Sequence, residues 1–181
     1  MKRILFAAVG VLVTATAAQA QSNAEVQRAL APLSGRSAEG AMVVHWNADH
    51  SYTTLKEGSN GWVCYDRSSD PGRPAFAVQC TNTGNLDRVA QNRRIAAQAQ
   101  GDSDVNTRLV AEAAANGERV PAVFGSVWLN LNGADQASAG RHMTVAVPNA
   151  TAESLGVPAR PSGGVLWIMA GGTTEAHLMS P

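Results

Sequence analysis

Two histidines in the last third of the sequence, His142 and His177, stand among residue types that bind small molecules. Alternation along the predicted strands places them on one face of a sheet, because successive side chains of a strand point to opposite sides. Aromatic side chains beside a few polar groups are typical of a small-ligand pocket. The face comprises Trp128, Asn130, His142, Thr144, Trp167, Met169, His177 and Met179.

Three other interpretations of this face stay open. The residues can pack beneath helices, each imidazole being hydrogen-bonded to a backbone group, as buried polar side chains usually are. A hydrolase-like enzyme would use His142 and His177 as acid and base, although no serine or cysteine nucleophile is tied to them by spacing. A Cu(I) site would join these imidazoles to the thioether of Met143, Met169 or Met179, and Met143 is expected to point away from His142.

The sequence lacks the patterns of the common catalytic and nucleotide-binding sites. It contains no Gly-x-Ser-x-Gly, His-Glu-x-x-His, Gly-x-Gly-x-x-Gly or Walker A segment. We therefore predict no cofactor and assign no catalytic residue. The function favoured is a non-enzymatic module that binds a small ligand on the His/Trp/Met face. The alternatives are a hydrolase-like enzyme, a Cu(I)-binding protein, and an envelope structural or interaction protein.

The two cysteines, Cys64 and Cys80, lie on opposite arms of a predicted hairpin. Residues 61–65 and 74–80 are predicted strands, and a turn centred near Gly72 places the cysteines directly opposite, within bonding distance. In an exported protein such a pair is most simply a disulfide. A pair of metal-bound thiols is the alternative, but there is no Cys-x-x-Cys spacing and no nearby histidine.

Strand signals gather at both ends of the chain, with helical periodicity between them. This order predicts an α+β fold, in which two or three short helices cover an antiparallel sheet. A short helix is expected from Asn23 to about Ala31, followed by a linker over residues 34–40. Two longer helices are expected over residues 85–98 and 103–115. The strands are expected at residues 41–46, 51–56, 61–65, 74–80, 123–131, 141–147, 164–170 and 177–179.

The first twenty residues have the three parts of a secretory signal peptide. Lys2 and Arg3 precede the apolar run Ile4–Val13, and Ala18-Gln19-Ala20 is a small-x-small cleavage site. The apolar run is about half the length that a spanning helix needs. We therefore predict a periplasmic or secreted protein, with an N-terminal helix and linker over residues 21–40 and one α+β domain over residues 41–181.

The charge of the mature chain argues against two classes of partner. Without Lys2 and Arg3, the 14 basic residues fall to 12, against 14 acidic residues. Nucleic acid and anionic membrane surfaces both require a basic surface. No integral membrane segment is expected after residue 20. The expected partner is an unknown small molecule or an envelope protein.

Several segments together resemble a family of small secreted bacterial proteins of uncharacterised function. They are Gly58-Ser59-Asn60-Gly61-Trp62-Val63-Cys64, Arg141-His142-Met143, Trp167-Ile168-Met169 and Ala176-His177-Leu178-Met179. The family carries Gly-x-Asn-Gly-Trp-x-Cys, Gly-Pro-His-x-Met and C-terminal Ala-His-x-Met segments, and Arg141 stands here in place of its proline. The resemblance covers about residues 41–181 and is least over residues 83–120. It implies that His142 and His177 belong to the family pattern, and it implies no activity.

Overall fold

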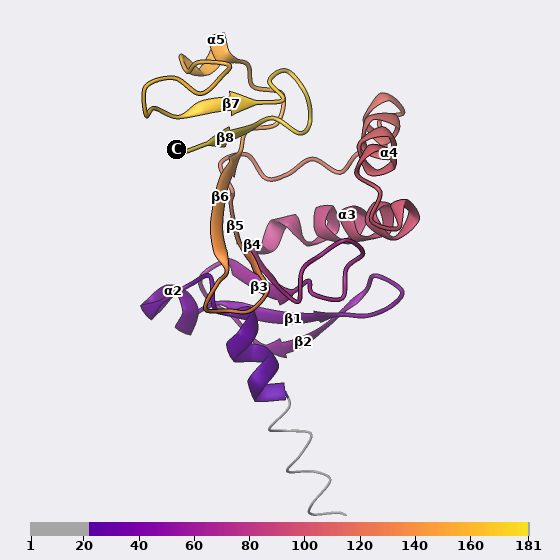
Figure 1. Cartoon of the computed structure of the whole chain (residues 1–181), viewed down its shortest axis with the longest axis vertical. Helices are drawn as coiled ribbons and strands as arrows, with labels where there is room; N and C mark the ends of the chain where they lie inside the picture. Colours follow the sequence, from indigo (N-terminus) through magenta and orange to yellow (C-terminus); the bar gives the residue numbers. More distant parts are fainter. Residues whose placement is uncertain (1–21, 181) are drawn as a thin grey trace, which may run out of the picture.

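The computed structural model describes residues 22–180, so the predicted signal peptide lies outside the described residues. The described chain forms one eight-stranded sheet of order β2-β1-β3-β4-β5-β6-β8-β7 (Figure 1). All neighbouring strands are antiparallel except β1 and β3, so the predicted α+β class with a mostly antiparallel sheet is confirmed. The strands are β1 (Met42–Trp46), β2 (Tyr52–Lys56), β3 (Trp62–Asp66), β4 (Phe76–Asn82), β5 (Val127–Gly133), β6 (Gly140–Ala146), β7 (Trp167–Met169) and β8 (His177–Met179).

Helices lie on both faces of this sheet. A helix over residues 22–29 packs on one face, and α3 (Leu86–Ala99) covers part of the other. α4 (Ser103–Ala115) packs on α3 and contains no buried residue, so it is a second layer and not a cover on the sheet. The short helical segments are α2 (Gly35–Glu39), η1 (Thr83–Asn85) and α5 (Ala152–Leu155). Within residues 22–180, no helix is long and apolar enough to cross a membrane.

The N-terminal helix shares a hydrophobic core with the centre of the sheet. Ala29 and Leu30 are buried against Val43, Cys64 and Leu129. Burial of this kind stabilises the fold by roughly 25 cal/mol for each Å² of apolar surface removed from water. The predicted N-terminal helix is therefore part of the sheet's packing. The segment after it, expected to be a linker, forms α2.

Two further apolar clusters complete the core. One lies between the sheet and α3, where Val89 of the helix meets the strands, and the other lies between the β7–β8 hairpin and α5. The cluster at α3 contains Val44, Trp46, Val63, Tyr65 and Val89. The cluster at the hairpin contains Val147, Ala150, Ile168 and Ala176.

The Gly58–Gly61 segment of the family-like pattern has a structural role in the turn between β2 and β3. A Cβ on Gly58 would lie 2.3 Å from the Met42 backbone nitrogen, so only glycine fits at this close approach. The Asn60 amide donates to the Ser37 carbonyl oxygen at 2.9 Å, and its oxygen accepts from the Trp62 backbone N–H at 3.1 Å. These contacts join α2 to the start of β3.

The disulfide between Cys64 and Cys80 is present, as predicted. The two residues are direct partners in the β3–β4 register, and their Cα atoms lie 4.1 Å apart. Both are fully buried beneath the N-terminal helix. The covalent link therefore fixes the two central strands at the point where the helix packs.

We expect reduction of this disulfide to lower the free energy of unfolding by about 3 kcal/mol, because it frees a loop with a sequence separation of 16 residues in the unfolded chain. Urea unfolding followed by tryptophan fluorescence, with and without reductant, measures the difference. The Cys64→Ala/Cys80→Ala double variant should be at least as destabilised and should not respond to reductant. Equal midpoints for the oxidised and reduced wild-type protein would contradict the expectation.

Candidate functional site

The strand register brings the predicted face together. Residues that are direct partners in neighbouring antiparallel strands point to the same side of a sheet. One row of partners runs Trp128, Thr144, Met179, Trp167 across β5, β6, β8 and β7. Parallel rows contain Asn130 with His142, and Ala146 with His177 and Met169. All eight predicted residues therefore lie on the α3 side of the sheet.

The two imidazoles are far apart along that face. His177 is opposite Ala146, which is four residues beyond His142 in β6, a separation of about 14 Å along the strand. His142 is exposed, and Met143 points to the opposite face, as the partner of Leu129. This spacing does not allow His142 and His177 to act on one substrate atom or to bind one metal ion.

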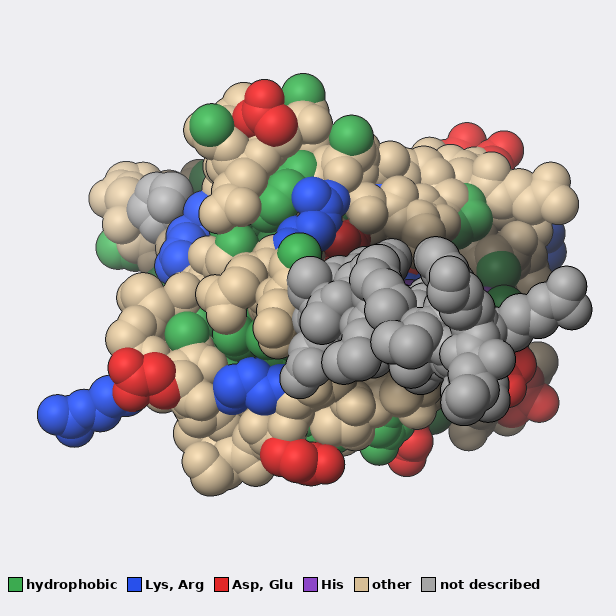
Figure 2. Space-filling model, turned by 90° about the horizontal axis from the view of Figure 1, so that it is seen from below, with side chains coloured by type: hydrophobic (Ala, Val, Ile, Leu, Met, Phe, Trp, Pro, Cys, Tyr) green, Lys and Arg blue, Asp and Glu red, His purple; other side chains and the backbone are tan. Residues whose placement is uncertain are grey.

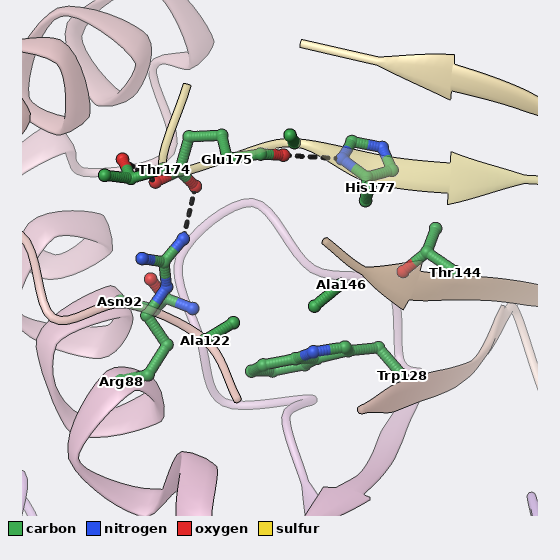
Figure 3. A pocket seen from close by; sticks show the side chains of 10 residues that line it. Arg88, Asn92, Ala122, Trp128, Thr144, Ala146, Thr174, Glu175 and His177 are labelled. Carbon is green, nitrogen blue, oxygen red and sulfur yellow. Dashed lines mark hydrogen bonds and ion pairs between the residues drawn. The ribbon is translucent and has the colours of Figure 1, made fainter. Parts of the chain in front are cut away.

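A cavity of about 160 Å³ lies between this face and α3. Of the eight predicted residues, Trp128, Thr144 and His177 line it; the other five do not. Figure 3 shows the Trp128 ring along one side, Thr144 and Ala146 beside it, and the pair of Arg88 and Glu175 at one end. The small side chains of Ala122, Ala146 and Ala176 leave the space open.

Glu175 holds two arginines from distant parts of the chain. Its Oε2 atom accepts from Arg88 Nη2 at 2.5 Å, and its Oε1 atom accepts from Arg119 Nε at 2.8 Å. Burial raises the pKa of the Glu175 carboxyl, but the hydrogen bond from Arg119 and the charge of Arg88 outweigh it, so the pKa lies below its ordinary value. Burial and the charge of Arg119 lower the pKa of Arg88.

A second cavity of about 260 Å³ adjoins the first. Both are lined by Asn92, Trp128 and Glu175, which stand between them. The second cavity is also lined by Arg67, Arg73 and Arg119 and by the amide side chains of Gln79 and Asn106. It is therefore more polar and more basic than the first.

Asp70 is the carboxylate near this second cavity, and both of its oxygen atoms already accept hydrogen bonds from arginines. It is buried, and it accepts hydrogen bonds from Arg67 and Arg93. Within residues 22–180, the Arg73 guanidinium forms no ion pair and no hydrogen bond. Arg73 is an exposed residue, and partial desolvation together with the charge of Arg67 lowers its pKa. Positive charge therefore exceeds negative charge at this end of the site.

Asn130 belongs to a structural hydrogen-bond network. Gln79 Nε2 donates to Asn130 Oδ1 at 2.6 Å, and Gln79 Oε1 accepts from the Tyr65 hydroxyl at 2.6 Å. Burial raises the pKa of Tyr65, so its hydroxyl remains a donor. This network satisfies polar groups beneath α3 and fixes the floor of the second cavity.

Comparisons with family models, curated proteins and solved structures found no match for this chain. The site must therefore be interpreted from its own geometry. Sequence reasoning did not identify the arginines or Glu175, which come from α3, the β3–β4 connection and two loops. The available signal was the use of arginine at every basic position after Arg3 except Lys56, because arginine forms the multiple fixed hydrogen bonds that buried ion pairs need.

We expect Glu175→Gln to lower the free energy of unfolding by about 3 kcal/mol at neutral pH, because two buried guanidiniums lose their shared carboxylate. The pKa of Glu175 is lowered in the folded state, so this stabilisation is complete above its ordinary value of 4.5 and is lost as the pH falls through the lowered pKa. Urea unfolding across this range should show the difference between wild type and variant shrinking in acid.

Glu112→Gln is the matched control for this measurement. Glu112 pairs with Arg108 on α4, where both side chains are exposed, and such a pair contributes only about 0.5 kcal/mol. Equal losses in the two variants, or a Glu175→Gln difference that does not change in acid, would contradict the assignment.

Proposed function

We propose that this protein is an exported, non-enzymatic module that binds a small organic anion containing one flat ring in the two cavities beneath α3. The observation that carries the proposal is the position of Trp128, whose ring borders both an alanine-lined cavity and an arginine-lined one. An aromatic wall with a few polar groups is the usual composition of a ligand pocket.

The smaller cavity has the volume for one aromatic ring. It measures about 160 Å³, and a cavity of about 150 Å³ in another protein is large enough for benzene. The Trp128 ring offers a surface for offset or edge-to-face contact with a second ring. Thr144 and His177 supply hydrogen-bonding groups for a polar substituent on that ring.

The arginines that line the larger cavity would bind the anionic group of the ligand. Arg73 has no partner among the described residues, and Asp70 is already shared by Arg67 and Arg93. A planar guanidinium binds a carboxylate through two parallel hydrogen bonds, which also reduces its repulsion with Arg67. The face drawn in Figure 2 has acidic and basic side chains interspersed and no large basic patch.

Binding fits this site better than acid–base catalysis. Glu175 is the carboxylate at the cavity, and its lowered pKa makes it a weak base. His177 is the imidazole at the cavity, its Nδ1 donates to the Glu175 carbonyl oxygen at 2.8 Å, and neither cavity is lined by a serine or a cysteine that it could activate. The disulfide supports a location in the periplasm or outside the cell, where such bonds persist.

Calorimetric titration of the mature protein with benzoate and with benzamide tests the proposal. We expect benzoate to bind more tightly, because only benzoate carries the negative charge. Trp128→Ala should weaken benzoate binding at least about tenfold, since a buried aromatic contact of this kind contributes more than about 1 kcal/mol. Arg73→Gln should remove the preference for benzoate over benzamide.

Two variants serve as matched controls. Trp167→Ala removes an indole from the same sheet face outside both cavities, and Arg94→Gln removes an exposed arginine from α3. Both should bind benzoate as the wild type does. Equal affinity for benzoate and benzamide in the wild type, or equal losses in Trp128→Ala and Trp167→Ala, would refute the proposal.

A further inference from the structure

Three side chains with soft or nitrogen donors lie together on the β7–β8 hairpin. Met169 is the direct partner of His177, and Met179 follows His177 by two residues in β8, so all three point to the same side. The Cβ atoms of opposed partners lie about 5 Å apart, and residues two apart in a strand are separated by about 7 Å. Both distances are within the reach of flexible methionine side chains.

This side of the hairpin does not belong to the hydrophobic core. The alternate residues Ile168 and Leu178 pack into the cluster at α5, on the opposite side. Met169 is 45% exposed, whereas His177 and Met179 are partly buried. β7 and β8 form the end of the sheet that lies away from α3 in Figure 1, and His177 is the one of the three side chains that shares a cavity with this helix. Methionine usually fills gaps inside a core, so its placement on this open face calls for another explanation.

The imidazole of His177 is oriented as a metal ligand requires. Its Nδ1 atom lies 2.8 Å from the Glu175 carbonyl oxygen (Figure 3). A carbonyl oxygen only accepts, so Nδ1 carries the proton, and in the neutral ring Nε2 is left with a free lone pair. A hydrogen bond from the second ring nitrogen to a backbone carbonyl is the usual support of a metal-bound histidine.

We propose that the β7–β8 hairpin binds one Cu(I) ion through Nε2 of His177 and the thioether sulfurs of Met169 and Met179. Thioether and imidazole donors together favour Cu(I), while Mg²⁺ and Ca²⁺ require oxygen donors. Glu175, the carboxylate two residues before His177, is paired with Arg88 and Arg119. Trp167 is the partner of Met179 on the same face, and an aromatic face attracts a bound cation.

This site shares His177 with the proposed site for an organic anion, and it differs from that site in its two methionines. Neither Met169 nor Met179 lines the cavities beneath α3. His142 and Met143 take no part, because His142 lies about 14 Å away along the sheet and Met143 points to the opposite face. The copper site can therefore be tested with methionine variants that leave the cavities intact.

Anaerobic titration of the mature protein with Cu(I), in competition with the chromophoric chelator bicinchoninate, tests the proposal. We expect one Cu(I) per chain, and Met169→Leu and Met179→Leu should each weaken binding at least about tenfold. Leucine keeps the side-chain volume and apolar character, so the fold is preserved. Trp167→Phe should remove the change in tryptophan fluorescence that accompanies Cu(I) binding.

Met143→Leu is the matched control, because it removes a thioether from the neighbouring strand β6 on the opposite face. It should bind Cu(I) as the wild type does. Unchanged affinity in both Met169→Leu and Met179→Leu, or an equal loss in Met143→Leu, would overturn the proposal. Benzoate binding measured on the same variants should not change, so failure of either proposal can be distinguished from failure of the other.

Discussion

The pleat of β5, β6 and β8 determines which side chains can meet at either proposed site. Val127 and Leu129 of β5 pack with the N-terminal helix core, and their partners Val145 and Met143 point the same way. A slip of one residue in the register of β6 would turn Thr144 to the side of the N-terminal helix. The same slip would turn Val145 and Met143 to the α3 side of the sheet. Burial on one face therefore fixes the composition of the other. The apolar packing on the opposite face of the sheet therefore also determines the positions of the residues that line the cavities and of Met169 and Met179.

In this fold, arginine side chains form hydrogen bonds and ion pairs between elements that are far apart in the sequence. Arg88 joins α3 to the Val120 carbonyl oxygen and to Glu175, and Arg141 joins β6 to the Pro32 carbonyl oxygen. Removing a guanidinium from water is costly, and the ion pair with its hydrogen bonds offsets that cost only when the geometry is good. Compared with apolar residues of the same volume, such ion pairs add little net stability, whereas removing one partner leaves a buried charge unpaired and is costly.

The limits of α3 and α4 could be predicted closely from the sequence, and the arginine-lined cavities could not. The strand limits were predicted less closely: β4 was expected at residues 74–80 and is Phe76–Asn82, and β5 was expected at residues 123–131 and is Val127–Gly133. α3 and α4 begin and end within one residue of their expected limits, because apolar periodicity and the Asp102 cap are local signals. β7 is shorter than expected, because Gly163 and Gly164 take positive φ values and bend the chain before Trp167. The face containing Trp128 followed from alternation alone. Glu175 pairs with Arg119 and Arg88, which precede it by 56 and 87 positions in the sequence, and no local sequence pattern predicts contacts over such separations.

The loose attachment of α4 has a consequence for how molecules reach the interior. No residue of α4 is buried, yet Asn106 and Val110 form part of the wall of the larger cavity. Because α4 has no buried residue whereas α3 has four, opening of α4 should cost less free energy than opening of α3. Local opening of α4 would widen the larger cavity to solutes while the disulfide-linked sheet stays intact.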